Sequence, residues 1–591
     1  MTLPRRTEPR DGREATAWVV CGLFALAWAA FSCVWLGGSV TAALLGPGWD
    51  PPPYGPGSAV ALIDRGPTAL WPHVPPGVTA TGALAALALA AVPAVLLVRR
   101  LLRVLSRTPG LAGRRELAPL LPKGAAARAR ALRPSLRGIR DLHPDDRGNL
   151  LGDLAPGGPE LRSSYEDVEL HLMAPRSGKT TGIAVPRVLR APGPVVLTSN
   201  KADVYTVTRR ARLELGTVWT FDPQGIAHTE RAMWWDMLAQ AATIEGARRL
   251  AGHFVAAVND DAGQRDFWIS AAHNTLTALF HAAARAGRQV PDVLAWLSDP
   301  GDRTPVDLLR DAGMNALADQ LDGTVRGAVE TRDGIYETAR QCLACLLDPQ
   351  VAAWVTPDPG VPRFRPEAHV LRLDTLYLLS KDGGGSAAGI IAAAADAALR
   401  AAVEAAERTG GRLDPPMTAV LDEAANVCRI ADLPDLYSHL GSRGVNVVTL
   451  LQSYRQGSRV WGEAGMDALW GASTVKLLGP GMDDADFAER ISKLVGDYDA
   501  GTVAYTDGGA GGHSRSTSYR PQRILPVERI RALPKGSALL LGTGVRPALI
   551  RLRPWYREPG AEAVGAAAEA EEAAIAERAA VKRTPGGVER V

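Results

Sequence analysis

The sequence predicts an α/β fold with a mainly parallel central sheet, preceded by two membrane-spanning helices and interrupted by an all-α segment. Three observations indicate this fold: two long uncharged apolar runs near the N-terminus, a phosphate-loop motif after a strand-like stretch, and a distant apolar strand that ends in two carboxylates. Strands that are apolar on both faces are typical of parallel sheets covered by helices. The 591 residues exceed what one hydrophobic core usually organises, so we expect several structural units.

The first element is a membrane anchor over residues 15–98. No charged residue occurs in 15–45 or in 78–98, and each run reaches the roughly 20 apolar residues that a spanning helix needs. The first run is longer than the roughly 7 to 15 apolar residues of a signal peptide, and a second run follows it. We therefore expect transmembrane helices at about 16–38 and 78–98, joined by a short extracytoplasmic loop.

The distribution of arginines predicts the orientation of this anchor. Arginines cluster before the first span and after the second, whereas the loop between the spans holds only Arg65. Because basic residues stay on the cytoplasmic side of a membrane, residues 1–14 and all residues after the second span are expected in the cytoplasm. The flanking arginines are Arg5, Arg6, Arg10 and Arg13 on one side and Arg99, Arg100, Arg103 and Arg107 on the other.

Residues 99–150 are expected to form a basic juxtamembrane linker. Between Arg99 and Arg140 there are twelve Lys or Arg residues and one acidic residue, Glu116. Attraction to anionic lipid, worth about 1 kcal/mol per basic residue near the surface, is one explanation. Contact with the phosphates of a nucleic acid is the other.

Residues 174–181, APRSGKTT, follow a strand expected at 168–173 and end as a phosphate-binding loop ends. In such a loop, backbone N–H groups hold the phosphates, the lysine reaches the outer phosphates and the next hydroxyl binds Mg²⁺. Lys179 and Thr180 occupy these two positions. Met173 stands where the motif has its first glycine, so we expect the turn from strand to loop to differ from the usual one.

A second motif lies far downstream, where the apolar strand 417–421 is followed by Asp422 and Glu423. An aspartate at this place would hold the shell of a Mg²⁺ ion, and the glutamate would orient and deprotonate the attacking water. A strand that ends in two acids also occurs as the start of a helix. The presence of Lys179 upstream favours the Mg²⁺ interpretation.

The next apolar strand, 445–451, ends in Gln452, which is placed to sense the outer phosphate or the water. Arg443 lies in the turn before that strand. An arginine finger donated to a neighbouring subunit, worth roughly 10³ to 10⁵ in rate, is one interpretation of Arg443. An ordinary surface arginine is the other.

Other segments are expected to carry no chemistry. Cys342 and Cys345 form a CxxC without a second ligand pair at zinc spacing, so we expect packing residues. The glycines at 383–385 are followed by no Lys-Ser or Lys-Thr, which excludes a second phosphate loop. Residues 500–522, rich in Gly, Ser and Thr, are expected to form a mobile loop, and the Ala/Glu-rich tail 559–591 a marginal helix or a disordered segment.

Taken together, these residues resemble the type IV secretion coupling proteins of the TraG/TraD kind, over about residues 15–555. Two N-terminal spans before a motor domain are also that family's usual layout. The resemblance is carried by Pro186, PGPVVLTSNKAD at 192–203, FDPQG at 221–225 with Trp234 and Trp235 after it, LDEAANV at 421–427, SRGVNVVTLLQS at 442–453, LWGASTVKLLG at 469–479 and LPKGSALLLGTGVRP at 533–547.

The resemblance implies a RecA-like P-loop NTPase in a bacterial inner or plasma membrane, with the motor domain at 151–229 and 358–558 and an inserted all-α domain at 230–357. It implies a homo-hexamer that hydrolyses ATP with Mg²⁺ and moves single-stranded DNA, with or without a relaxase, into a type IV secretion channel. The ATP-binding residues would be Arg176, Ser177, Gly178, Lys179, Thr180 and Thr181, the metal ligands Thr180 and Asp422, and the catalytic residues Lys179, Glu423, Gln452 and Arg443.

Three other functions stay open at this point. A double-stranded DNA translocase of the chromosome-segregation type shares the motor and the tether, but that class usually has more spans. A motor that secretes only protein is a second possibility. A receptor that binds substrate without hydrolysing ATP is the third, and the presence of Lys179, Asp422 and Glu423 argues against it.

Overall fold

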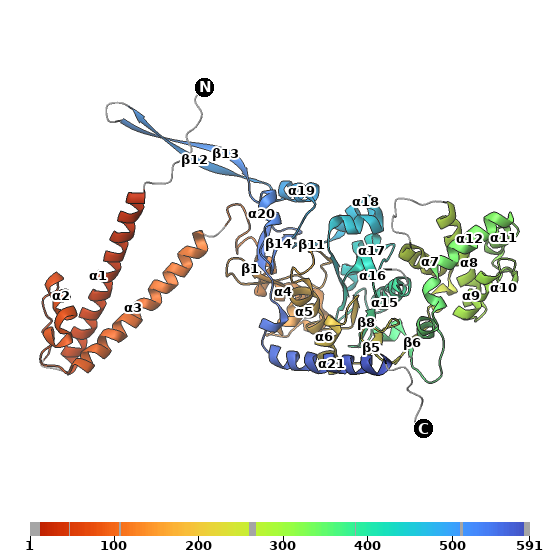
Figure 1. Cartoon of the computed structure of the whole chain (residues 1–591), viewed down its shortest axis with the longest axis horizontal. Coiled ribbons are helices and arrows are strands. Elements are labelled where there is room, and N and C mark those ends of the chain that lie inside the picture. Colours follow the sequence, from red (N-terminus) through yellow and green to blue (C-terminus); the bar gives the residue numbers. More distant parts are fainter. Residues whose placement is uncertain are drawn as a thin grey trace. The chain divides into compact units, whose positions relative to one another are not determined.

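A computed structural model describes residues 12–45, 48–105, 108–258, 267–383, 386–508 and 512–583. The chain divides into two compact units, residues 1–107 and 108–591, and each is described by itself (Figure 1).

The first unit is a helical hairpin. Its long helices are α1 (Gly12–Leu45) and α3 (Pro76–Leu105), and the connection between them holds α2 (Pro56–Arg65) and the short η1 (Pro67–Ala69). The segments Phe24–Leu45 and Pro76–Leu96 have the length and apolar composition of membrane-crossing helices. The two apolar helices expected in front of the motor are therefore present.

Glycines allow α1 and α3 to approach closely. A Cβ atom added at Gly37 would lie 2.4 Å from the carbonyl oxygen of Gly82, and one added at Gly82 would meet the Thr41 side chain. Small residues at a helix contact are common in membrane-embedded helix pairs, because backbones can then pack against each other. The glycine positions therefore fix how the two helices of this unit pair.

The second unit is built on an eleven-stranded sheet in the order β2-β1-β15-β14-β11-β3-β10-β9-β4-β8-β5. The strands from β11 to β5 in this order are parallel, and those from β14 to β2 extend the sheet in antiparallel fashion. The mainly parallel sheet is thus confirmed. The strands are β1 (Leu150–Leu154), β2 (Glu160–Arg162), β3 (Glu169–Leu172), β4 (Val195–Ser199), β5 (Val218–Phe221), β8 (Thr375–Leu379), β9 (Met417–Leu421), β10 (Val445–Leu451), β11 (Val475–Leu478), β14 (Ser537–Gly542) and β15 (Ala548–Arg551).

Helices cover both faces of this sheet, and successive residues of its strands divide between two cores. In β10, for example, Val447 joins the core that includes α15, whereas Val448 joins the core that includes α5 and α6. This division follows from the alternation of side chains along a strand. The helices outside the insert are α4 (Pro122–Leu132), α5 (Val185–Leu189), α6 (Asp203–Leu213), α14 (Pro366–His369), α15 (Ala388–Arg408), α16 (Ala424–Val427), α17 (Leu433–Leu440), α18 (Tyr454–Ala472), α19 (Ala485–Val495), α20 (Val527–Arg531) and α21 (Ala561–Arg583).

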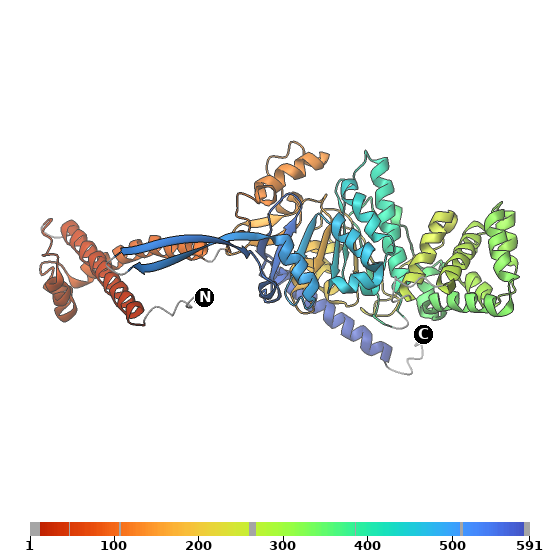
Figure 2. The same cartoon turned by 90° about the horizontal axis from the view of Figure 1, so that it is seen from above.

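A helical insert leaves and rejoins this body at one place, where the short strands β6 (Trp234–Trp235) and β7 (Arg363–Phe364) pair in parallel. Between them the described residues form helices and no strand, and this part lies at one end of the unit (green in Figure 2). Burial raises the pKa of both Cys342 and Cys345 to about 11, as expected for packing residues. Its helices are α7 (Ile244–Val258), α8 (Phe267–Arg285), α9 (Val290–Ser298), α10 (Thr304–Asp311), α11 (Asn315–Val325), α12 (Val329–Cys342) and α13 (Pro349–Ala352).

Part of the basic segment expected to be a linker is folded into the second unit. Leu117 and Leu120 are buried in the core that includes α5. Arg133 is almost fully buried and donates to Asp146 at 2.7 Å and to Asp414 at 3.0 Å. Scattered leucines supply enough apolar surface to hold the segment in place despite its charge, and the positive charge at Arg133 is matched inside the protein.

The prediction of a mobile loop at 500–522 is wrong. The structure has two antiparallel strands there, β12 (Asp497–Gly508) and β13 (Gly512–Arg523), paired from Asp497 with Arg523 to Gly508 with Gly512. Threonine, valine and tyrosine along these residues are strand formers. Gly508 and Gly512, two of the glycines that suggested a loop, are direct partners in this pair of strands.

The tail forms the helix α21, which contacts the second unit at α6. In α21, Glu571 pairs with Arg209 of α6 and with Arg578 of its own helix, both at 3.0 Å. Ile575 packs against the core that includes α6. Alanine is a strong helix former, and these contacts add the tertiary support that a helix without an apolar stripe was expected to lack.

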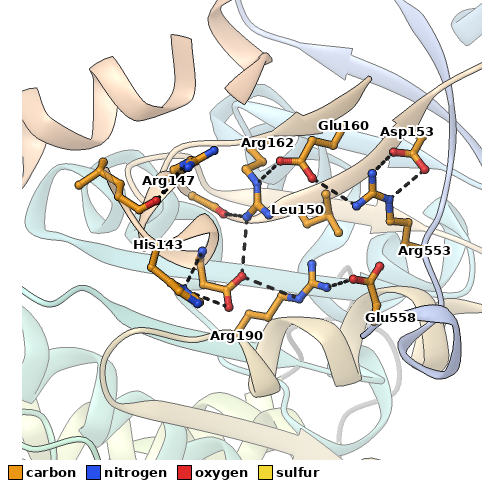
Figure 3. Close-up of polar contacts among 12 residues, drawn as sticks. His143, Arg147, Leu150, Asp153, Glu160, Arg162, Arg190, Arg553 and Glu558 are labelled. Carbon is orange, nitrogen blue, oxygen red and sulfur yellow. Dashed lines mark hydrogen bonds and ion pairs between the residues drawn. The ribbon is translucent and has the colours of Figure 1, made fainter. Parts of the chain in front are cut away.

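A chain of ion pairs ties the antiparallel end of the sheet together (Figure 3). Arg553 binds Asp153 with two nitrogens and reaches Glu160 at 3.2 Å, and Arg162 donates to Glu160 at 3.1 Å. Arg190, directly after α5, pairs with Glu558. We call Asp153, Glu160, Arg162, Arg190, Arg553 and Glu558 the edge network.

Candidate nucleotide site

Three neighbouring parallel strands bring the predicted site residues to one edge of the sheet. The phosphate loop follows β3, Gln452 follows β10, and Asp422 follows β9, and the three strands are adjacent in the order β3, β10, β9. Leu172 pairs with Leu451, so the loop and Gln452 start at the same level. Ligands of open α/β sheets bind at the carboxyl ends of the strands.

The phosphate loop contains two residues with positive φ. Gly178 has φ 96°, and Arg176, a non-glycine residue, has φ 61°. The chain then turns into the π-helical η5 (Thr180–Ala184), which continues as α5. Because nothing lies within 4 Å of a Cβ added at Gly178, the glycine is required by its backbone angle and not by lack of space.

Met173 prolongs the strand by one residue. Its N–H donates to the carbonyl oxygen of Leu451 at 3.0 Å, and its side chain is buried. A Cβ added at Gly479 would lie 2.6 Å from the Met173 side chain. A small residue on the next strand therefore accommodates the methionine, and the loop begins at Ala174.

Lys179, Glu423 and Gln452 meet in one cluster. The ammonium of Lys179 lies 2.7 Å from Glu423 Oε1, and the amide of Gln452 donates to Glu423 Oε2 at 2.9 Å. Lys179 and Glu423 are both buried. The structure thus joins three residues that are up to 273 positions apart in the sequence, from 179 to 452.

Asp422 lies next to this cluster and has one carboxyl oxygen without a hydrogen-bond partner among the described residues. That oxygen is Oδ1, and the side chain is buried. Burial raises the pKa of Asp422 to about 7, although Lys179 lowers it, and Glu423 adds to the increase. A buried carboxylate oxygen without a partner fits a bound cation, and Mg²⁺ commonly takes only one or two protein carboxylates together with phosphates and waters. Ser177 Oγ, in the loop, is likewise buried without a partner.

Glu423 holds a left-handed backbone conformation, with φ 53° and ψ 40°. Such a conformation costs energy for a residue with a side chain, and it persists only where neighbours hold it. It turns the chain sharply between β9 and α16. This turn brings the carboxylate of Glu423 to Lys179.

Arg443 lies at the other edge of the sheet. It ends the short helix η9 (Gly441–Arg443) directly before β10, whereas Gln452 directly follows β10. At about 3.3 Å per residue, the seven residues of β10 separate the two by roughly 20 Å. Arg443 pairs with Glu407 at 3.3 Å. The structure therefore does not bring Arg443 to Lys179 of the same chain, and a role in a neighbouring subunit's site stays a prediction.

A cavity of about 330 Å³ opens at the same edge, beside the start of the phosphate loop. Pro175 and Gln452 line it together with Tyr454 and Phe487, whose rings stack at 4.5 Å. The sequence interpretation did not include these aromatic residues. For Tyr454 the available signal was its position two residues after Gln452, whereas Phe487 is far from Gln452 in the sequence.

Comparisons with known proteins concern the family and the fold. Residues 416–535 match the family model described as the TraM recognition site of TraD and TraG. No curated protein sequence matches the chain. The bacterial conjugative coupling protein TrwB, in an unbound form, is 18% identical with a TM-score of 0.50, over 68% of this chain and 88% of that one. VirB4 of Thermoanaerobacter pseudethanolicus is 13% identical with a TM-score of 0.38, over 70% of this chain and 98% of that one.

The sheet order, the phosphate loop and the paired acids define a RecA-like P-loop NTPase fold, as predicted. Within that class, the match over residues 416–535 confirms the resemblance to coupling proteins of the TraG/TraD type.

Proposed function

We propose that this chain is a membrane-anchored ATPase that moves single-stranded DNA, with or without a bound relaxase, into a type IV secretion channel. The observation that carries the proposal is the convergence of Lys179, Asp422, Glu423 and Gln452 at one sheet edge. The coupling-protein family match supports the cargo class, and the apolar helices of the first unit support the membrane anchor. We propose a homo-hexamer on the same family basis.

Each residue of the cluster has a definite part in hydrolysis. The backbone of residues 176–181 and the Lys179 ammonium bind the phosphates, which requires Lys179 to leave Glu423. Thr180 and Asp422 would hold Mg²⁺, which neutralises phosphate charge when bound. Glu423, released from Lys179, takes the proton of the attacking water, and Gln452 orients that water.

The test is ATP hydrolysis by the full chain in lipid nanodiscs, alone and with single-stranded or duplex DNA. We expect hydrolysis that single strands stimulate more than duplex does. A preference for duplex would favour a chromosome-type translocase. Stimulation by a relaxase alone would favour a protein secretion motor, and binding of ATP without hydrolysis under all conditions would favour a receptor.

DNA binding supplies an independent check of the cargo. If phosphates dominate the contact, the logarithm of affinity for single strands falls with the logarithm of salt concentration by about 0.7 per contact. The measurement is fluorescence anisotropy of a labelled single strand between low and physiological salt. Binding that salt does not weaken would exclude DNA phosphates as the main contact.

A further inference from the structure

Two side chains outside the cluster connect Glu423 to Gln452 by a second route. Gln456, in the first turn of α18, accepts a hydrogen bond from the backbone N–H of Gln452 at 2.9 Å. Its amide nitrogen donates to Asn426 Oδ1 at 2.8 Å. Asn426, in α16, donates its backbone N–H to the carbonyl oxygen of Glu423 at 2.8 Å. With the bond from Gln452 to Glu423, these contacts close a ring.

Helix capping does not explain the ring. Ser453 caps α18 by accepting from the backbone N–H of Gln456 at 3.2 Å, and Ser453 to Gln456 has the sequence of a capping box. In a capping box, the side chain of the fourth residue would return to the backbone of Ser453 itself. Gln456 instead reaches one residue further back, to Gln452, and uses its amide nitrogen, which a cap does not need, on Asn426.

The ring acts on the two residues whose positions decide hydrolysis. Glu423 has a left-handed backbone, which needs neighbours to hold it, and Asn426 fixes the turn that follows it. The pairing of β10 with β3 ends at Leu451, so the strand does not hold Gln452. The backbone N–H of Gln452 is held instead by the side chain of Gln456. The side chains of Gln456 and Asn426 join the turn after Glu423 to the start of α18, and without their bond the direct link between the two residues is the hydrogen bond from Gln452 to Glu423.

We propose that Gln456 and Asn426 are positioning residues that hold Glu423 and Gln452 in register for attack of water on the outer phosphate. This inference rests on the proposed ATPase function. Because the hydrogen bonds of both side chains go to residues outside the phosphate loop, we expect them to affect the rate of hydrolysis and not the binding of nucleotide. Displacements of about 1 Å in a catalytic group can cost about a hundredfold in rate.

The sharpest variant is Gln456→Glu, which keeps an acceptor for the Gln452 N–H and a capping side chain but cannot donate to Asn426. We expect kcat for ATP to fall about tenfold or more, with KM, affinity for a fluorescent ADP analogue and Tm unchanged. Gln320→Glu, an exposed position on α11, is the control with the same change of charge. Its kcat should equal that of the wild type.

A double-variant cycle tests whether the two residues act as one unit. Asn426→Leu should lower kcat by a similar factor, and Gln456→Glu with Asn426→Leu should be little worse than either single variant. Unchanged kcat in Gln456→Glu, or losses that multiply in the double variant, would overturn the ring while leaving the ATPase proposal intact. A wild-type chain that never hydrolyses ATP would overturn the proposed function, and this inference with it.

Discussion

Two charged clusters in the second unit, the edge network and the nucleotide site, differ in how their carboxylates are paired. In the edge network (Figure 3), Arg553 is shared between Asp153 and Glu160, and Arg190 is paired with Glu558. At the nucleotide site, Lys179 and Glu423 are paired, but the buried Oδ1 of Asp422 has no hydrogen-bond partner in the described part of the chain.

This difference indicates what each cluster does. Buried polar atoms are nearly always hydrogen-bonded, so an orphan carboxylate oxygen requires an explanation. A carboxylate with a strongly raised pKa next to a lysine, at the ligand-binding edge of a sheet, is typical of a functional site. The edge network, whose charges are matched, joins β1, β2 and the segments after α5 and β15.

The largest expected effect is loss of turnover at the nucleotide site. Lys179→Ala should abolish nucleotide binding, whereas Glu423→Gln should keep binding and reduce hydrolysis by about 10² to 10⁴, because it removes a general base. The measurement pairs ATP hydrolysis with binding of a fluorescent nucleotide. Hydrolysis at the wild-type rate in Glu423→Gln would contradict the assignment of the base.

The next effect is stabilisation by ligand. At about 100 times its Kd, a nucleotide with Mg²⁺ should raise the free energy of unfolding by about 2.7 kcal/mol. Asp422→Asn should lose the Mg²⁺-dependent part of this stabilisation. It should keep the stabilisation by nucleotide that remains in the presence of EDTA. The measurement is Tm with nucleotide, with and without Mg²⁺. An equal response to Mg²⁺ in both proteins would exclude Asp422 as a ligand.

The two clusters should respond to pH with opposite signs. The pKa of Asp422 is raised to about 7, so its contribution to stability in the ligand-free protein is lost as pH rises from about 4 to 7, by about 1.4 kcal/mol per pKa unit. For Glu160, the effect of Arg162 and Arg553 outweighs the effect of burial, so the pKa lies below its usual 4.5. The contribution of Glu160 to stability is therefore lost as pH falls below about 4.5. Denaturant unfolding of wild type and Asp422→Asn between pH 5 and 8 checks the first sign. A constant difference between them would contradict it.

The smallest expected effect is on the edge network. Arg553→Met should lower the free energy of unfolding by roughly 1 kcal/mol, since its partners are partly exposed and screened by salt. ATP hydrolysis should not change. Arg210→Met, which removes an exposed helix pair with Glu214, is the matched control and should leave stability nearly unaltered. A loss of hydrolysis in Arg553→Met would show that the two clusters are coupled.

The sequence was sufficient to place those site residues whose chemical role few other residue types can fill. Lys179, Asp422, Glu423 and Gln452 could be placed together because each follows an apolar strand, and parallel strands share an edge. Gln456 and Asn426 could not be found this way, since glutamine and asparagine near a helix start are ordinary capping residues. The contact that distinguishes them joins two separate elements.

Two other predictions were wrong because they relied on local amino-acid composition. Glycines such as Gly508 and Gly512 suggested a loop, although these two are direct partners in paired strands, and the threonine, valine and tyrosine along them favour strands. The arginines of 99–140 suggested a surface linker, whereas Leu117 and Leu120 decide where that chain lies. Strand propensity outweighed the glycines in the first case, and tertiary burial outweighed the charge in the second.

The paired strands β6 and β7 bring the two ends of the helical insert to neighbouring positions, since Trp234 and Arg363 are direct partners. Adjacent strands lie about 4.8 Å apart, so the chain enters and leaves the insert at one point of the second unit. The insert still packs on the sheet body, because Leu250 and Phe254 of α7 share a core with α15, and His253 lies 3.2 Å from Asp396 of α15. Because the two ends of the insert are neighbours, the order of the strands that carry Lys179, Asp422 and Gln452 does not depend on how many residues the chain spends between 236 and 362.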